Sequence, residues 1–221
     1  MSASWVVTVG ADATSATYEP SLGSADAAVF VCAHGAGGSM NDRSVVATAN
    51  ALRAHGIGVV RFNFLYKEKK RGRPDQMPLL QDTVAAVAER ARTELAPHRL
   101  VIGGRSMGGR AASMLAAAGF AANGLLLLAY PLHPPGKPEQ LRDAHLPRIT
   151  LPVLCFCGTR DPFVTRSLME RVLERVTAPC EMHWVEGADH SFHVLKSSGR
   201  TDAAVMEQIA ETSRHWVDRA L

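Results

Sequence analysis

The chain has 221 residues, a formal net charge of +3, and a hydrophobic fraction of 47% that is ordinary for a soluble globular protein. This length suits an α/β domain with a sizeable core, so we expect residues 1–221 to form a single domain. The small positive charge does not indicate a nucleic-acid-binding protein, and no apolar run is long enough to cross a membrane. Met1–Trp5 lack a basic segment and a long apolar run, so we expect no signal peptide and a cytoplasmic location.

The four cysteines, Cys32, Cys155, Cys157 and Cys180, do not have the spacing of a zinc site. We expect Cys155 and Cys157 to point to opposite faces of a strand, which indicates neither a disulfide nor a redox pair. We interpret all four as small core residues in a reducing compartment.

The first part of the chain alternates strand-like and helix-like segments. Trp5–Val9 and Ala16–Tyr18 predict an antiparallel pair at a sheet edge, and the continuous apolar run Ala27–Ala33 predicts a strand buried on both faces. A helix and the strand Ile57–Phe62 follow. The helix is indicated by apolar Val45, Val46, Ala49 and Leu52 at helical spacing, by a cap at Asn41 or Asp42, and by Gly56 at its end.

The remaining chain continues this alternation. Asn63–Gln76 predicts an irregular loop, and a helix is expected from about Pro78 to Leu95. A strand from Leu100 leads through a glycine-rich turn into a helix over Ala111–Ala117. We further predict strands at Gly124–Tyr130, Pro152–Gly158 and Glu181–Val185, helices at Val164–Val176 and Thr201–Leu221, and a proline-rich loop with at most one short helix at Pro131–Pro147. The pattern predicts an α/β fold with a mostly parallel, doubly wound sheet flanked by helices.

The turn Gly104-Arg105-Ser106-Met107-Gly108 has the pattern G-x-S-x-G between a predicted strand and a predicted helix. This is the context of a nucleophile elbow, in which a strained turn holds a serine hydroxyl above the sheet edge. Glycines are expected at both ends because side chains there would collide with neighbouring elements. We therefore predict that Ser106 is a nucleophile at a helix N-terminus.

A serine nucleophile needs a base and a group that orients the base, and these collect at the carboxyl ends of parallel strands. Asp161 follows the predicted strand Pro152–Gly158, and His190 follows the last strand. Ser106, Asp161 and His190 therefore form the predicted triad, in the chain order serine, acid, histidine. The weaker alternatives are Asp189, Glu186 and Asp143 for the acid and His193 for the base.

An oxyanion hole requires two backbone N–H groups beside the nucleophile. One is expected from Met107, the residue after the serine, and the other from Ala36 in the glycine-rich turn His34–Gly38. This turn lacks the third glycine of a dinucleotide loop and the lysine of a phosphate-binding loop. We expect His34 to brace the turn rather than to take part in chemistry.

The segments HGAGGSM, GGRSMGGRAA, GTRDPF and GADHSF together resemble the α/β-hydrolase superfamily. More narrowly, they resemble its dienelactone-hydrolase-like branch and the small hydrolase-like family related to testis-expressed proteins and an NSL-complex subunit. The resemblance implies that Ser106 is the nucleophile, Asp161 the acid and His190 the base. Dienelactone hydrolase itself has a cysteine nucleophile, so Ser106 argues against that particular substrate.

The segment between the strands ending near Tyr130 and beginning at Pro152 is too short for a helical cap, so we expect a lidless, open site. The sequence predicts a serine hydrolase that acts on small carboxylic esters or thioesters, without a metal or a cofactor. The alternative is a non-catalytic interaction module that binds a partner through the basic loop Lys67–Arg73, which is expected on the same rim as Ser106. The oligomeric state is left open.

Overall fold

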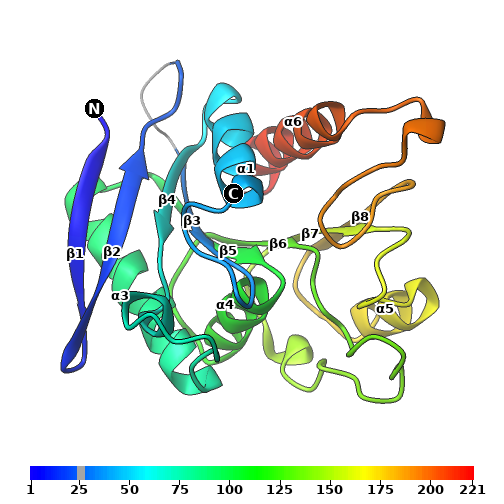
Figure 1. The fold of residues 1–221 in the computed structure, drawn as a ribbon, viewed down its shortest axis with the longest axis horizontal. Coiled ribbons are helices and arrows are strands. Elements are labelled where there is room, and N and C mark those ends of the chain that lie inside the picture. Colours follow the sequence, from blue (N-terminus) through cyan, green and yellow to red (C-terminus); the bar gives the residue numbers. More distant parts are fainter. Residues whose placement is uncertain (24–27) are drawn as a thin grey trace.

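The computed structural model describes residues 1–23 and 28–221, and its centre is an eight-stranded sheet. The strands are β1 (Ala3–Val9), β2 (Asp12–Glu19), β3 (Ala28–Ala33), β4 (Gly58–Phe62), β5 (Arg99–Arg105), β6 (Gly124–Leu128), β7 (Val153–Gly158) and β8 (Cys180–Val185). They follow the order β1-β2-β4-β3-β5-β6-β7-β8 from left to right in Figure 1. Pairing is antiparallel from β1 to β4 and parallel from β4 to β8.

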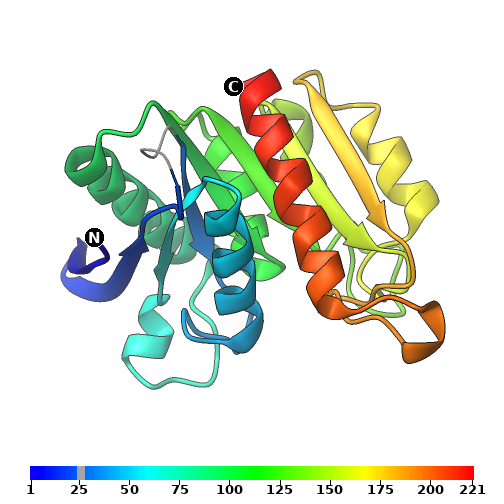
Figure 2. The same cartoon turned by 90° about the horizontal axis from the view of Figure 1, so that it is seen from above.

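Helices cover both faces of the sheet. The longer ones are α1 (Arg43–Ala54), α3 (Met77–Leu95), α4 (Met107–Ala117), α5 (Arg166–Leu173) and α6 (Asp202–Ala220). Helices α1 and α6 lie on one face, and α3, α4 and α5 lie on the other (Figures 1 and 2). The short helical segments are α2 (Leu65–Glu68), η1 (Leu146–Arg148) and η2 (Lys196–Ser198). This three-layer arrangement confirms the predicted doubly wound α/β fold.

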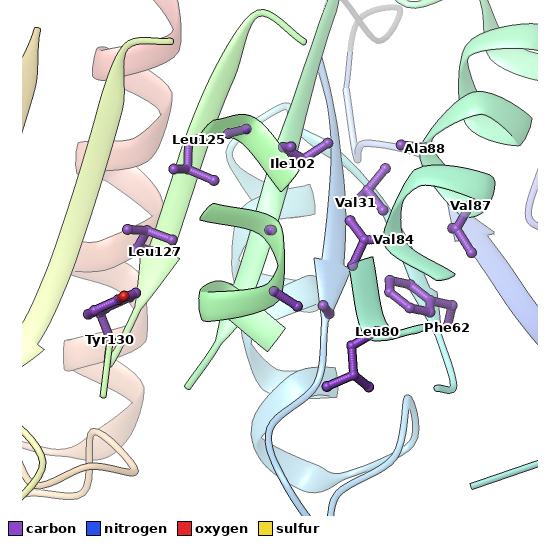
Figure 3. Packing of buried hydrophobic residues seen from close by; sticks show 14 of the residues in the cluster. Val31, Phe62, Leu80, Val84, Val87, Ala88, Ile102, Leu125, Leu127 and Tyr130 are labelled. Carbon is purple, nitrogen blue, oxygen red and sulfur yellow. The ribbon is translucent and has the colours of Figure 1, made fainter. Parts of the chain in front are cut away.

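Successive residues of the central strands enter two hydrophobic clusters, one on each face of the sheet. On β6, Leu125 and Leu127 belong to the cluster that α3 and α4 cover, whereas Leu126 and Leu128 belong to the cluster that α1 and α6 cover. Figure 3 shows part of the first cluster, with α3 packed against β3 and β5. Burial of each such leucine contributes about 1.5–3 kcal/mol, and burial on both faces explains the continuous apolar runs in the sequence.

Helices α6 and α1 begin in different ways. Thr201 caps α6, since its hydroxyl oxygen accepts a hydrogen bond from the Ala204 N–H at 3.1 Å. Asp42 precedes α1, as predicted, but its carboxylate accepts a hydrogen bond from the Ser39 hydroxyl instead of capping the helix. Ala27, the first residue of the predicted third strand, lies outside the described residues.

The predicted strand Ala16–Tyr18 is part of the longer β2, and the predicted strand Gly124–Tyr130 ends at Leu128. Two further segments differ in their helices. Asn63–Gln76, predicted as an irregular loop, contains helix α2, because Phe64, Leu65 and Tyr66 turn inward and are fully buried. Helix α5 is shorter than the predicted Val164–Val176. It begins after the extended Thr165, and its C-terminal end tightens into turns closed by hydrogen bonds between residues three apart.

Among the described residues, none forms a cap domain over the carboxyl edge of the parallel strands. The only helical segment between β6 and β7, both of which are fully described, is the single turn η1. This confirms the prediction of a fold without a cap. Among the described residues, every helix is too short or too polar to cross a lipid bilayer.

The predicted orientation of two cysteines is wrong. Residues two apart on a strand share a face, and Cys155 and Cys157 accordingly lie in the same hydrophobic cluster. Both are buried and free. Cys32, in the opposite cluster, is also buried and free, whereas Cys180 is free and only partly buried. Burial raises the pKa of the Cys32 thiol to about 12 and that of Cys180 to about 11, so these thiols are unreactive near neutral pH.

The close pairing of β5 with β6 depends on Gly103. Its φ is +155°, and a Cβ atom at this position would lie 1.9 Å from the Leu126 carbonyl oxygen. We expect Gly103→Ala to lower the free energy of unfolding by about 2–4 kcal/mol, measured by urea denaturation. Gly72→Ala is the matched control, since a Cβ atom at Gly72 meets nothing within 4 Å. Equal stability of the two variants would contradict this close approach.

Candidate active site

Ser106 lies in a sharp turn between β5 and α4. Its φ is +47° and its ψ is −116°, a region that non-glycine residues rarely adopt and that typically costs ~1–3 kcal/mol. Two hydrogen bonds stabilise the turn: the Ser106 N–H donates to the Leu128 carbonyl at 2.9 Å, and the Ser106 carbonyl accepts from the Arg110 N–H at 3.0 Å. The turn therefore has the geometry of a nucleophile elbow.

The flanking glycines allow this turn to approach β3. A Cβ atom at Gly104 would lie 2.1 Å from the Ala33 carbonyl oxygen, and one at Gly108 would lie 2.6 Å from the carbonyl oxygens of Ala33 and His34. Any larger residue would push α4 away from β3. The predicted reason for glycine at both positions is confirmed.

The side chains of Ser106, His190 and Asp161 meet at the carboxyl edge of the sheet. His190 Nε2 lies 2.9 Å from Ser106 Oγ, and His190 Nδ1 lies 2.7 Å from Asp161 Oδ2. A carboxylate only accepts hydrogen bonds, so the proton of a neutral His190 is on Nδ1 and Nε2 accepts from the serine hydroxyl. Three residues that are far apart in the sequence thus form one continuous hydrogen-bonded chain.

The surroundings of Asp161 and His190 hold both side chains in place. Asp161 is buried, and its second carboxylate oxygen accepts a hydrogen bond from the Phe163 N–H at 2.8 Å. The Phe163 ring packs on the His190 imidazole, with ring centroids 4.3 Å apart. The Asp161 carboxylate is therefore shielded from water, while the His190 imidazole remains partly exposed.

The weaker sequence candidates have other partners. Asp189 shapes its own turn by accepting from the Ser191 and His193 N–H groups. The His193 imidazole pairs with Asp202. Of the other two acids, Glu186 accepts a hydrogen bond from Thr159, and Asp143 pairs with Arg175. None of these four side chains joins the hydrogen-bonded chain at Ser106.

The glycine-rich turn after β3 lies beside the serine. A Cβ atom at Gly35 would lie 3.6 Å from Ser106 Cβ, and Ala36 and Met107 both line the cavity that contains Ser106. The structure therefore brings together the two segments from which the oxyanion-hole amides are expected.

His34 supports this turn through two hydrogen bonds of its imidazole ring. Its Nε2 accepts a hydrogen bond from the Phe64 N–H at 3.1 Å, so its proton is on Nδ1, which donates to the Gly35 carbonyl at 2.8 Å. Burial lowers the pKa of His34 and keeps the imidazole neutral. The structural role expected for His34 is confirmed by these contacts.

Sequence reasoning missed Arg105, the residue before the serine. Its Nη2 donates to the His190 carbonyl at 2.7 Å, and its guanidinium lies 6.0 Å from the Phe192 ring centroid. Burial lowers the pKa of Arg105, but an arginine remains charged at neutral pH. The sequence did contain a signal for this role. An arginine at the end of an apolar strand is expected to be buried, and a buried charge needs hydrogen-bonding partners within the protein.

The basic loop Lys67–Arg73 does not line the cavity. Lys67 Nζ reaches the glycine-rich turn and donates to the Gly37 carbonyl at 3.1 Å, which agrees with the expected place on the rim. Lys69 pairs with Asp12, and Arg71 pairs with Asp75. The charges of Lys69 and Arg71 are therefore neutralised within the protein.

The cavity has a volume of about 720 Å³ and is open to solvent at the edge of the sheet. Its wall includes the glycine-rich turn, Ser106, Phe163 and His190, together with three arginines. Among the described residues, no cluster of His, Cys, Asp or Glu side chains could hold a metal ion.

A mostly parallel sheet with a serine elbow after the fifth strand defines the α/β-hydrolase fold. Residues 26–218 match the model of a protein family described as an alpha/beta hydrolase domain, and the chain belongs to this family.

Solved structures show the same fold. Dienelactone hydrolase from Anabaena variabilis superposes with a TM-score of 0.78 at 18% identity, over 100% of this chain and 98% of that chain. An α/β serine hydrolase homologue from Coxiella burnetii gives 0.77 at 20% identity, over 96% of both chains. A lidless α/β serine hydrolase from Xanthomonas campestris gives 0.76 at 24% identity, over 97% of this chain and 94% of that chain.

Protonation of His34 is expected to destabilise the protein. Because burial lowers the pKa of His34 from 6.5, the unfolded chain binds this proton at a higher pH than the folded chain does. The free energy of unfolding therefore falls as the pH drops below about 6.5. We expect His34→Gln to reduce this fall, measured by urea denaturation at about pH 7 and about pH 5. His98→Gln, which changes an exposed histidine, should keep the wild-type pH dependence of the free energy of unfolding. If this free energy falls equally in both variants, His34 is not held neutral.

Proposed function

We propose that this protein is a serine hydrolase that cleaves carboxylic esters or thioesters through an acyl-enzyme on Ser106. One observation carries the proposal: Ser106 Oγ, His190 Nε2, His190 Nδ1 and Asp161 Oδ2 are linked by contacts of 2.9 and 2.7 Å. This geometry allows a proton to leave the serine as its oxygen attacks a carbonyl carbon.

In the first half of the reaction, Ser106 Oγ attacks the substrate carbonyl while His190 Nε2 takes the hydroxyl proton. The buried carboxylate of Asp161 stabilises the imidazolium that forms. The carbonyl oxygen becomes an anion beside the N-terminus of α4, where the N–H groups of Met107 and Ala36 are proposed to bind it. His190 then gives its proton to the leaving alcohol or thiol, and the acyl group stays on Ser106.

In the second half, a water molecule attacks the acyl-enzyme and transfers a proton to His190. The tetrahedral intermediate collapses, the proton returns to Ser106 Oγ, and the carboxylic acid leaves. Arg105 supports both halves as a positioning residue, since its bond to the His190 carbonyl holds the histidine loop against the elbow.

The cavity is open, and the described residues form no cap over it, which favours small or protruding acyl groups. The named neighbours include a dienelactone hydrolase and serine hydrolases, which supports a small-molecule substrate.

We also propose that the 221 residues form one cytoplasmic domain. The narrower kinship with the testis-expressed and NSL-related group remains a prediction from the motifs.

Substitution of the proposed nucleophile or of the proposed acid is expected to lower ester hydrolysis strongly. Ser106→Ala should lower kcat by about 10⁴-fold or more, and Asp161→Asn by about 10³–10⁴-fold, because each breaks the hydrogen-bonded chain. Hydrolysis of 4-nitrophenyl acetate measures both effects. Glu186→Gln and His193→Gln are matched controls and should retain activity within about threefold, because neither side chain joins the chain. Wild-type activity in Ser106→Ala would refute the proposal.

A further inference from the structure

Three arginines line the cavity around Ser106, and among the described residues only Arg105 makes a short side-chain hydrogen bond. Arg105 binds the His190 carbonyl, as described above. Arg110 and Arg142 line the same cavity, yet no described carboxylate lies within ion-pair distance of either guanidinium. Partly buried positive charges without partners are unfavourable. The position of these two arginines beside Ser106 therefore suggests that a bound group compensates their charge.

Arg110 is held one helical turn from the serine. Its backbone N–H donates to the Ser106 carbonyl at 3.0 Å, and its own carbonyl accepts from the Ser113 hydroxyl at 2.8 Å. The Nε atom of its side chain is buried and has no hydrogen-bond partner among the described residues. A buried donor without an acceptor is unfavourable, unless a bound group supplies the acceptor.

Arg142 enters the cavity from the segment between β6 and β7. Its backbone is fixed at both ends, since its N–H donates to the Leu132 carbonyl at 2.8 Å and its carbonyl accepts from the Tyr130 hydroxyl at 2.6 Å. Among the described residues, the only acceptor for its guanidinium is the Pro131 carbonyl, at a long 3.4 Å. Burial, and then repulsion from the charge of Arg110, lower the pKa of Arg142.

Two acids near the cavity do not neutralise this pair. Asp161 is committed to His190 and Phe163. Asp42 also lines the cavity, but its carboxylate accepts from Ser39 and lies against Gly38 in the turn after β3.

We propose that Arg110 and Arg142 form a subsite for a carboxylate or phosphate group of the substrate, so that anionic esters are preferred. Two guanidinium groups offer paired donors that match the oxygens of either anion. The buried Arg110 Nε would gain its missing acceptor, and the repulsion between the two charges would be relieved. This inference names the substrate class of the hydrolase proposed above and rests on that function.

Two pairs of esters test the subsite from both sides of the scissile bond. The acyl pair is the 4-nitrophenyl half-ester of glutaric acid and its methylated, uncharged analogue. The leaving-group pair is 4-carboxyphenyl acetate and its methyl ester. We expect wild type to prefer the anionic member of at least one pair by about tenfold in kcat/KM, and Arg110→Gln/Arg142→Gln to bring that ratio to within about threefold of unity.

The matched control removes two charges elsewhere. Arg73 and Arg171 are exposed and lie outside the cavity, so Arg73→Gln/Arg171→Gln should keep the wild-type ratio. A wild type that hydrolyses the esters without preferring the anionic member of either pair would overturn the subsite. Retention of the preference in Arg110→Gln/Arg142→Gln would overturn it as well.

A binding measurement separates failure of the subsite from failure of the proposed function. Calorimetric titration of Ser106→Ala with glutarate, inorganic phosphate and uncharged glutaramide needs no catalysis. We expect glutarate or phosphate to bind at least about tenfold more tightly than glutaramide, and the stronger of the two identifies the preferred anion. Addition of Arg110→Gln and Arg142→Gln should remove this difference. Equal binding of all three compounds would overturn the subsite even if wild type cleaves esters.

Discussion

The close approach of helix α4 and strand β5 to strand β3 is the constraint on which the rest of the site depends. The turn can follow this path only because Gly104 and Gly108 have no side chain to collide with Ala33 and His34. The same path forces Ser106 to a φ of +47°, and the hydrogen bond from its N–H to Leu128 helps to offset that strain. The serine hydroxyl is thereby held at the N-terminus of α4.

The elbow also positions residues that come much later in the chain. Asp161 follows β7 and His190 follows β8, so the parallel sheet brings both to the same edge as Ser106. Arg105, within the elbow, then binds the His190 carbonyl. The histidine loop is therefore anchored to the serine turn twice, through its backbone and through its imidazole, and movement of the elbow would disturb both contacts.

Strands and site motifs could be predicted from the sequence because their causes are local. Continuous apolar runs such as Gly124–Leu128 reflect burial on both faces, and glycines around Ser106 reflect close backbone contacts. The partners of Arg105, Arg110 and Arg142 could not be predicted, because they depend on how distant loops fold over the sheet edge. The positive charges of the basic loop are adjacent in the sequence and form a recognisable pattern. The positive charge within the cavity comes from single arginines on separate segments, which form no such pattern.

The identity of the nucleophile is tested most directly by covalent labelling. A fluorophosphonate probe reacts with an activated serine, and mass spectrometry of the digested protein locates the adduct. We expect one adduct on the peptide that contains Ser106, and its loss in Ser106→Ala and in His190→Gln. Absence of labelling in well-folded wild type, or an adduct on another residue, would contradict the proposal that His190 and Asp161 activate Ser106.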